Sequence, residues 1–105
     1  MLDLNEKLYE EFLTGDKPVL VEYWAPWCVY CRRIVVAMEQ VAKNHEGRLV
    51  VGRINIDDFP ALADRERIEV VPTLLLYHRG DARGSMVAPE SRSRIEEFLE
   101  DYLEN

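Results

Sequence analysis

Two residues in this chain have the chemistry of a reactive pair: Cys28 and Cys31, its only cysteines. They follow an apolar run, Val19–Trp24, that is typical of a buried strand, and they precede apolar positions that recur at helical spacing. The cysteines therefore fall where a strand ends and a helix begins. Unpaired backbone N–H groups at a helix start favour an anion such as a thiolate, which is the reactive form of cysteine. The pair is a candidate dithiol–disulfide couple.

The two cysteines occupy different places on the expected helix. Cys28 stands at the helix start and is the predicted nucleophile, which would form a mixed disulfide with a substrate. Cys31 lies one turn further on and faces the protein, so we expect it to be the resolving thiol that attacks Cys28 and releases the reduced substrate.

A structural zinc site is the alternative use of the pair. Such a site usually needs four ligands, and the chain offers only the two cysteines, His45 and His78. The interval between the two histidines is far longer than the usual three to five residues. We therefore expect no metal and no cofactor, and we place both histidines at the surface.

The composition is that of an acidic single domain, residues 1–105. Thirteen basic against twenty acidic residues give a net charge of −7, which argues against nucleic acid as a partner because phosphate binding needs an excess of Lys and Arg. No apolar stretch approaches the roughly twenty residues of a membrane span, and the N-terminus lacks the features of a signal peptide. We expect a cytoplasmic monomer that does not bind membranes, although a signal removed beforehand would leave no trace.

The spacing of apolar residues along the chain predicts helices and strands that alternate on both sides of the cysteines. Asp3 and Glu6 suggest a capping box for a first helix that ends near Thr14. The last helix follows Pro89 and Ser91. Between them we expect a strand at Val19–Trp24, a helix at residues 28–44, a strand at 49–57, a short helix at 58–66 and strands at 73–78 and 83–87.

These residues resemble the thioredoxin family. The resemblance rests on the W-A-P-W-C-x-x-C core from Trp24 to Cys31, then Asn55-Ile56-Asp57, Val71-Pro72-Thr73 and Gly80. It implies an α/β thioredoxin fold, with a four- or five-stranded mixed sheet flanked by helices. Only residues 1–4 are available for the family's first edge strand, which should be short or absent. The helix after the cysteines should be straighter than in the family, because Val36 stands where the family often has a kinking proline.

Glu22 interrupts the apolar strand that leads to the cysteines. A charged residue is seldom buried without a partner or a task, although at an exposed edge it would have neither. In the family the usual residue here is aspartate, a proton acceptor for the resolving cysteine, and glutamate adds a methylene. Arg53 aligns with a position where the family often has lysine, and it would favour the ionised form of Glu22. We expect burial to raise the pKa of Glu22 above the usual value, with Arg53 opposing the shift.

The resemblance also implies the substrate surface. Pro72 would follow a cis peptide bond beside the cysteines, and the backbone of Val71 would pair with an extended substrate segment. Trp27 and Tyr30, with Ala88 and Pro89, would surround the site with apolar surface. Trp24 is expected in the core.

The function favoured by these features is the reduction of protein disulfides, with electrons from a thioredoxin-reductase-type donor. The Val29-Tyr30 pair between the cysteines leaves open a more oxidising, isomerase-like or glutaredoxin-like enzyme. A backbone N–H of Tyr30 aimed at the Cys28 sulfur would move the potential towards roughly −200 to −230 mV. The alternative of another class is a redox-inert binding module with the same fold.

Overall fold

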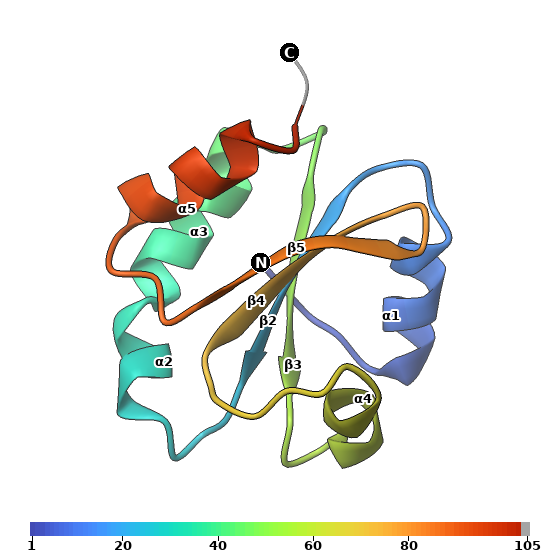
Figure 1. The fold of residues 1–105 in the computed structure, drawn as a ribbon, viewed down its shortest axis with the longest axis vertical. Coiled ribbons are helices and arrows are strands. Elements are labelled where there is room, and N and C mark those ends of the chain that lie inside the picture. The colour runs from blue at the N-terminus through green and yellow to red at the C-terminus, as the bar shows by residue number, and fades with distance from the viewer. Residues whose placement is uncertain (104–105) are drawn as a thin grey trace.

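The computed structural model describes residues 1–103, and a mixed five-stranded sheet in the order β1-β3-β2-β4-β5 forms its centre (Figure 1). β1, β3 and β2 run parallel, whereas β4 is antiparallel to both β2 and β5. The strands are β1 Leu2–Asp3, β2 Val19–Trp24, β3 Val50–Asn55, β4 Thr73–His78 and β5 Asp81–Val87. The helices are α1 Glu6–Leu13, α2 Val29–Arg33, α3 Val35–Asn44, α4 Pro60–Arg65 and α5 Arg92–Glu100.

Helices cover both faces of the sheet and so create two apolar cores. Figure 1 shows α2, α3 and α5 on one side of the sheet, and α1 and α4 on the other. Side chains alternate along β2, so Leu20 packs in the core under α3 and α5 while Val19 and Val21 pack in the other core. Both faces of this central strand are therefore covered, which explains why its sequence is an almost continuous apolar run.

The first edge strand is present but short, as expected. Leu2 and Asp3 pair with Gly52 and Arg53 of β3. Gly52 is needed here for space, because a Cβ at this position would lie 2.7 Å from Cδ1 of Leu4. The predicted capping by Asp3 is wrong: Asp3 belongs to β1, and α1 is capped by Asn5, whose side chain accepts a hydrogen bond from the Leu8 N–H at 2.8 Å.

The helix after the cysteines, predicted as one element over residues 28–44, is interrupted. It divides at Ile34, which has φ −91° and ψ 1° and separates α2 from α3. Ile34, Val35 and Val36 are consecutive β-branched residues, whose restricted side-chain rotamers lower helix propensity. The chain therefore departs from helical geometry here without the proline that the expectation required.

The other predicted elements are present with shifted ends. β4 has the predicted bounds, β3 and α4 are shorter, and β5 begins two residues earlier than the expected residue 83. The side chain of Ser91 caps α5 by accepting from the Arg94 N–H at 3.2 Å, and Ile95 and Leu99 dock this helix on the sheet. None of the helices within residues 1–103 is both long enough and apolar enough to cross a membrane.

Candidate active site

The two cysteines lie at the junction of β2 and α2 and are joined by a disulfide bond, with their Cα atoms 5.3 Å apart. Cys28 is the N-cap of α2 and retains 7% of its accessible surface, whereas Cys31 is fully buried in the first turn. An incoming substrate sulfur can therefore reach Cys28 but not Cys31. The division into nucleophile and resolving thiol requires such an asymmetry and stays a prediction.

Two backbone groups approach the sulfur of Cys28. The N–H of Cys31 donates to this Sγ at 3.1 Å, and the carbonyl oxygen of Val71 lies 3.7 Å from it. The prediction had assigned the sulfur's donor to the N–H of Tyr30, and this assignment is wrong. The donor is the backbone N–H of Cys31. This N–H is present whatever two residues stand between the cysteines. Val29 and Tyr30 therefore supply no donor to the Cys28 sulfur that would make the couple more oxidising.

Tyr30 instead contributes through its side chain. Its hydroxyl donates to the carbonyl oxygen of Pro89 at 2.8 Å and ties α2 to the segment before α5. Ala88, next to Pro89, is exposed and has a positive φ of 44°, and its N–H donates to the Pro72 carbonyl at 2.9 Å. These contacts fix one side of the surface around the cysteines. The Val71–Pro72 peptide bond is cis, as the resemblance implies.

The other side of the site is an open groove of about 310 Å³. Its lining is mostly apolar and consists of Trp27, Ile56, Ile68, Glu69, Val70 and Val71. The indole ring of Trp27 is 64% exposed and donates its N–H to Asp57 at 3.3 Å. Sequence reasoning identified Trp27 and Val71 but missed residues 68–70, because a short apolar stretch before a strand carries no signal of its own. Their sequence position directly before Val71 was the only available clue.

Glu22 is completely buried, and its position on β2 explains why. It is in register with Arg53 of β3 and Leu74 of β4, and it shares the face of β2 that Leu20 presents to α3 and α5. Neither carboxyl oxygen of Glu22 has a hydrogen-bond partner within the described part of the chain. Burial raises the pKa of Glu22 to about 7, and the opposing charge of Arg53 does not cancel the shift. The expected rise is confirmed.

Arg53 acts on Glu22 through its charge and not through a direct ion pair. Its guanidinium group lies over the ring of Trp24, 3.6 Å from the ring centroid, and its Nε is 3.6 Å from Oδ1 of Asp3. Among residues 1–103, no ion pair joins Arg53 to Glu22. Trp24, expected in the core, is half-buried beneath this arginine.

The two histidines lie apart from the cysteines in separate contacts. Nε2 of His45 is 2.6 Å from Oε1 of Glu96 and so links the end of α3 to α5, while the His78 ring contacts the Asp16 carbonyl at 3.1 Å. Burial alone would raise the pKa of Glu96, but the hydrogen bonds from His45 and Asn44 and nearby positive charge lower it overall. No three His, Cys, Asp or Glu side chains in residues 1–103 are grouped as metal ligands.

The arrangement has the parts needed for thiol–disulfide exchange. The less buried sulfur of Cys28, the buried sulfur of Cys31 and an apolar groove lie together where β2 ends, and the buried carboxyl group of Glu22 stands on the same strand. Fold and site together define the class of thiol–disulfide oxidoreductases built on a five-stranded α/β sheet.

Comparison with known proteins specifies the family within this class. The family model for thioredoxin matches residues 1–101. The chain is 34% identical over 104 residues to thioredoxin of Buchnera aphidicola, covering 98% of this chain and 95% of that protein. It is 33% identical over 94 residues to thioredoxin 1 of Nostoc sp., covering 90% of this chain and 88% of the relative. The chain belongs to the thioredoxin family.

Other relatives are longer than this chain. It is 32% identical over 102 residues to the chloroplastic M-type thioredoxin of Spinacia oleracea, which covers 96% of this chain but 56% of the relative. The matched part of the chloroplastic thioredoxin M4 of Arabidopsis thaliana is 47% of that protein. The chain thus spans about half the length of these chloroplastic relatives.

Proposed function

We propose that this protein reduces disulfide bonds in other proteins by cycling Cys28 and Cys31 between dithiol and disulfide. The observation that carries the proposal is the unequal exposure of the two sulfurs beside an apolar groove, with a backbone N–H directed at the accessible one. A groove lined by backbone and apolar side chains suits an extended polypeptide segment better than a small polar molecule.

The first step is attack by the Cys28 thiolate on a substrate disulfide. A bond forms between Cys28 Sγ and one substrate sulfur, and the other substrate sulfur leaves as a thiolate that takes a proton from solvent. The N–H of Cys31 stabilises negative charge on Cys28 before the attack, since it already lies 3.1 Å from that sulfur in the disulfide.

The second step is resolution of the mixed disulfide. Cys31 loses its proton and attacks Cys28 Sγ, so the Cys28–Cys31 bond forms and the second substrate thiolate leaves. We assign the removal of the Cys31 proton to Glu22, whose pKa of about 7 leaves a large ionised fraction at neutral pH. Each cycle transfers two electrons to the substrate, and a thioredoxin-reductase-type donor supplies two electrons to restore the dithiol.

Insulin reduction with dithiothreitol as the electron source tests the proposal. The wild-type protein should accelerate precipitation of the insulin B chain, and Cys28→Ser should abolish this activity. Cys31→Ser should instead trap a covalent mixed disulfide with the substrate, which non-reducing electrophoresis detects. Trapping by Cys28→Ser would reverse the two roles. A wild-type protein without activity would favour the redox-inert binding module.

A further inference from the structure

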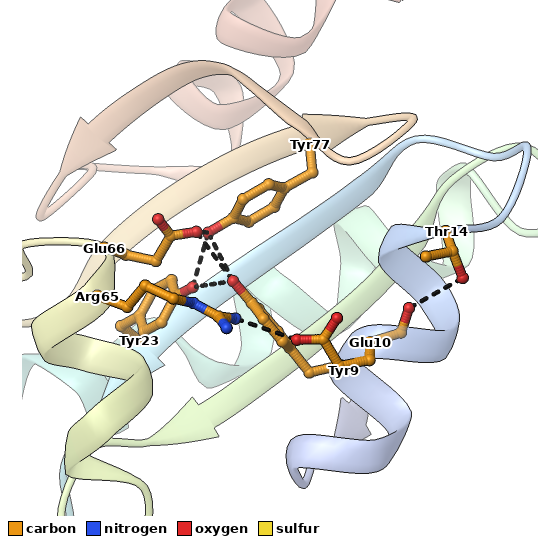
Figure 2. Close-up of polar contacts among 7 residues, drawn as sticks. All are labelled: Tyr9, Glu10, Thr14, Tyr23, Arg65, Glu66 and Tyr77. Carbon is orange, nitrogen blue, oxygen red and sulfur yellow. Dashed lines mark hydrogen bonds and ion pairs between the residues drawn. The ribbon is translucent and has the colours of Figure 1, made fainter.

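A cluster of three buried tyrosines and one half-buried glutamate lies on the face of the sheet opposite Glu22. The hydroxyls of Tyr9 and Tyr77 contact the carboxyl group of Glu66, and the Tyr23 hydroxyl contacts those two hydroxyls (Figure 2). Tyr9, Tyr23 and Tyr77 belong to α1, β2 and β4, respectively, and Glu66 directly follows α4. Proposed catalysis does not use this cluster, so its polar groups need another explanation.

Each of the three hydroxyl hydrogens in the cluster can be given one acceptor at the shortest contacts, while the longer Tyr9–Tyr77 and Tyr23–Tyr9 contacts, at 3.3 and 3.4 Å, are left without a hydrogen. Tyr9 and Tyr77 donate to Oε1 of Glu66 at 2.9 and 2.5 Å, and the Tyr23 and Tyr77 hydroxyl oxygens are 2.7 Å apart. Because Tyr77 gives its hydrogen to Glu66, Tyr23 is the donor to Tyr77. Burial raises the pKa of Tyr23 and of Tyr77, so both phenols remain protonated donors. The cluster therefore holds Glu66 from two directions.

Glu66 is the residue at which the chain leaves α4 for the active site. Arg67 follows with φ 57°, a left-handed conformation that a non-glycine residue adopts only at a cost. The N–H of Ile68 then donates to the Ala63 carbonyl at 2.9 Å. We call residues 68–71 the receiving strip, because they line the groove beside Cys28.

The receiving strip is held at its two ends and exposed between them. At its far end Oγ1 of Thr73 donates to the Val70 carbonyl at 2.6 Å. Val70 nevertheless exposes 53% of its side chain, and the carbonyl oxygen of Val71 is 3.7 Å from Cys28 Sγ. The near end begins two residues after Glu66, whose carboxyl group is held by Tyr9 and Tyr77.

We propose that Glu66 is a positioning residue that sets the receiving strip for extended polypeptide substrates. This inference rests on the proposed reduction of protein disulfides. A polypeptide must contact the strip as well as the sulfur, whereas a small aromatic disulfide needs only access to Cys28. Loss of the Glu66 anchor should therefore weaken polypeptide binding selectively.

Steady-state kinetics with two substrates test the inference. Glu66→Leu should raise KM for insulin about fivefold or more. This is the fold-change expected when substrate binding is weakened by the net contribution of roughly one hydrogen bond. The rate with the small disulfide 5,5′-dithiobis(2-nitrobenzoic acid) should stay within about twofold of wild type. Glu66→Gln keeps a carbonyl oxygen for both tyrosines and should restore the insulin KM. In this variant the amide nitrogen takes the place of Oε2 of Glu66. Within residues 1–103, Oε2 of Glu66 is not a buried atom that lacks a hydrogen-bond partner, so the exchange leaves the two tyrosine contacts at Oε1 intact.

Glu10→Leu is the matched control. Glu10 is an exposed glutamate on α1 that pairs with Arg65 at 3.3 Å near the cluster but does not contact the tyrosine hydroxyls (Figure 2). The Glu10→Leu variant should have the wild-type KM for insulin and the wild-type rate with the small disulfide. If Glu66→Leu does not fold, the double variant Tyr9→Phe and Tyr77→Phe removes the same hydrogen bonds and should give the same selective loss.

Amide hydrogen exchange provides a readout that is independent of activity. Glu66→Leu should increase exchange in residues 68–71 and leave α2 unchanged. An equal loss for both substrates, or unchanged exchange in the strip, would overturn the positioning role. Failure of the wild-type protein to reduce insulin would instead refute the proposed function.

Discussion

Two glutamates on opposite faces of one sheet, Glu22 fully buried and Glu66 half-buried, have opposite surroundings. Glu22, under α3 and α5, has no hydrogen-bond partner for either oxygen in the described part of the chain. Glu66, beside the core of α1 and α4, accepts from two tyrosine hydroxyls. The same functional group thus serves two purposes. Without donors, the buried carboxyl group exchanges a proton near neutral pH, whereas with donors it becomes a fixed point of the structure.

The largest effect should come from removing the titrating group. The pKa of Glu22 is raised from 4.5 to about 7, so between these pH values the folded state keeps a proton that the unfolded chain has released. The free energy of unfolding therefore falls as pH rises through this window, by on the order of 3 kcal/mol, and levels off above it. Glu22→Gln should not show this loss.

Urea denaturation of the oxidised protein at pH 4 and pH 8 measures the difference. The stability of Glu22→Gln relative to wild type should increase by about 3 kcal/mol between the two pH values. Glu22→Asp retains a carboxyl group and serves as the control that keeps the pH-dependent loss. A difference that is the same at both pH values would contradict a buried titration at Glu22.

A smaller effect is expected from removing one donor at the other glutamate. Tyr77→Phe leaves Glu66 with one tyrosine donor and takes away the hydroxyl that pairs with Tyr23 at 2.7 Å. The loss should lower the free energy of unfolding by about 2 kcal/mol, because buried polar groups are left with fewer partners. Urea denaturation at pH 7 measures it, with Tyr102→Phe at an exposed tyrosine as control. Equal stabilities of Tyr77→Phe and wild type would show that the cluster does not stabilise the fold.

Removal of the outer member of the cluster should cost less. Tyr23→Phe preserves both donors to Glu66 and removes only contacts between neutral hydroxyls, at 2.7 Å to Tyr77 and 3.4 Å to Tyr9. We expect a loss of about 1 kcal/mol in the same denaturation experiment. A loss larger than that of Tyr77→Phe would mean that Tyr23, and not Glu66, is the centre of the cluster.

The smallest effect should come from removing the positive charge of Arg53, which lowers the pKa of Glu22. Arg53→Met removes a positive charge that opposes the effect of burial, so the pKa of Glu22 should move further above 7. Carbon-13 NMR of the Glu22 carboxyl group measures the titration directly. An unchanged or lower pKa in Arg53→Met would show that Arg53 does not contribute to the electrostatics of the site.

The sequence was sufficient for the site's main residues because each carries a local signal. The Cys28–Cys31 spacing, the apolar strand before it and the lone carboxylate within that strand predicted both the redox pair and the burial of Glu22. Local signals were less reliable for details of geometry. The Ile34 break and the cap at Asn5 were missed because helix ends depend on small differences in propensity and competing hydrogen bonds.

The sequence by itself determined the reactive pair and the faces of the strands, because periodicity reports which side of an element is buried, while the fold class followed from the resemblance to a known family. Only the tertiary structure decided which side chains meet across elements. Tyr9, Tyr23 and Tyr77 lie far apart along the chain, and their convergence on Glu66 follows from the placement of α1 and α4 over β2 and β4. Likewise, Arg53 contacts Trp24 and Asp3 and not Glu22. Such contacts depend on side-chain directions in space, which one-dimensional spacing does not encode.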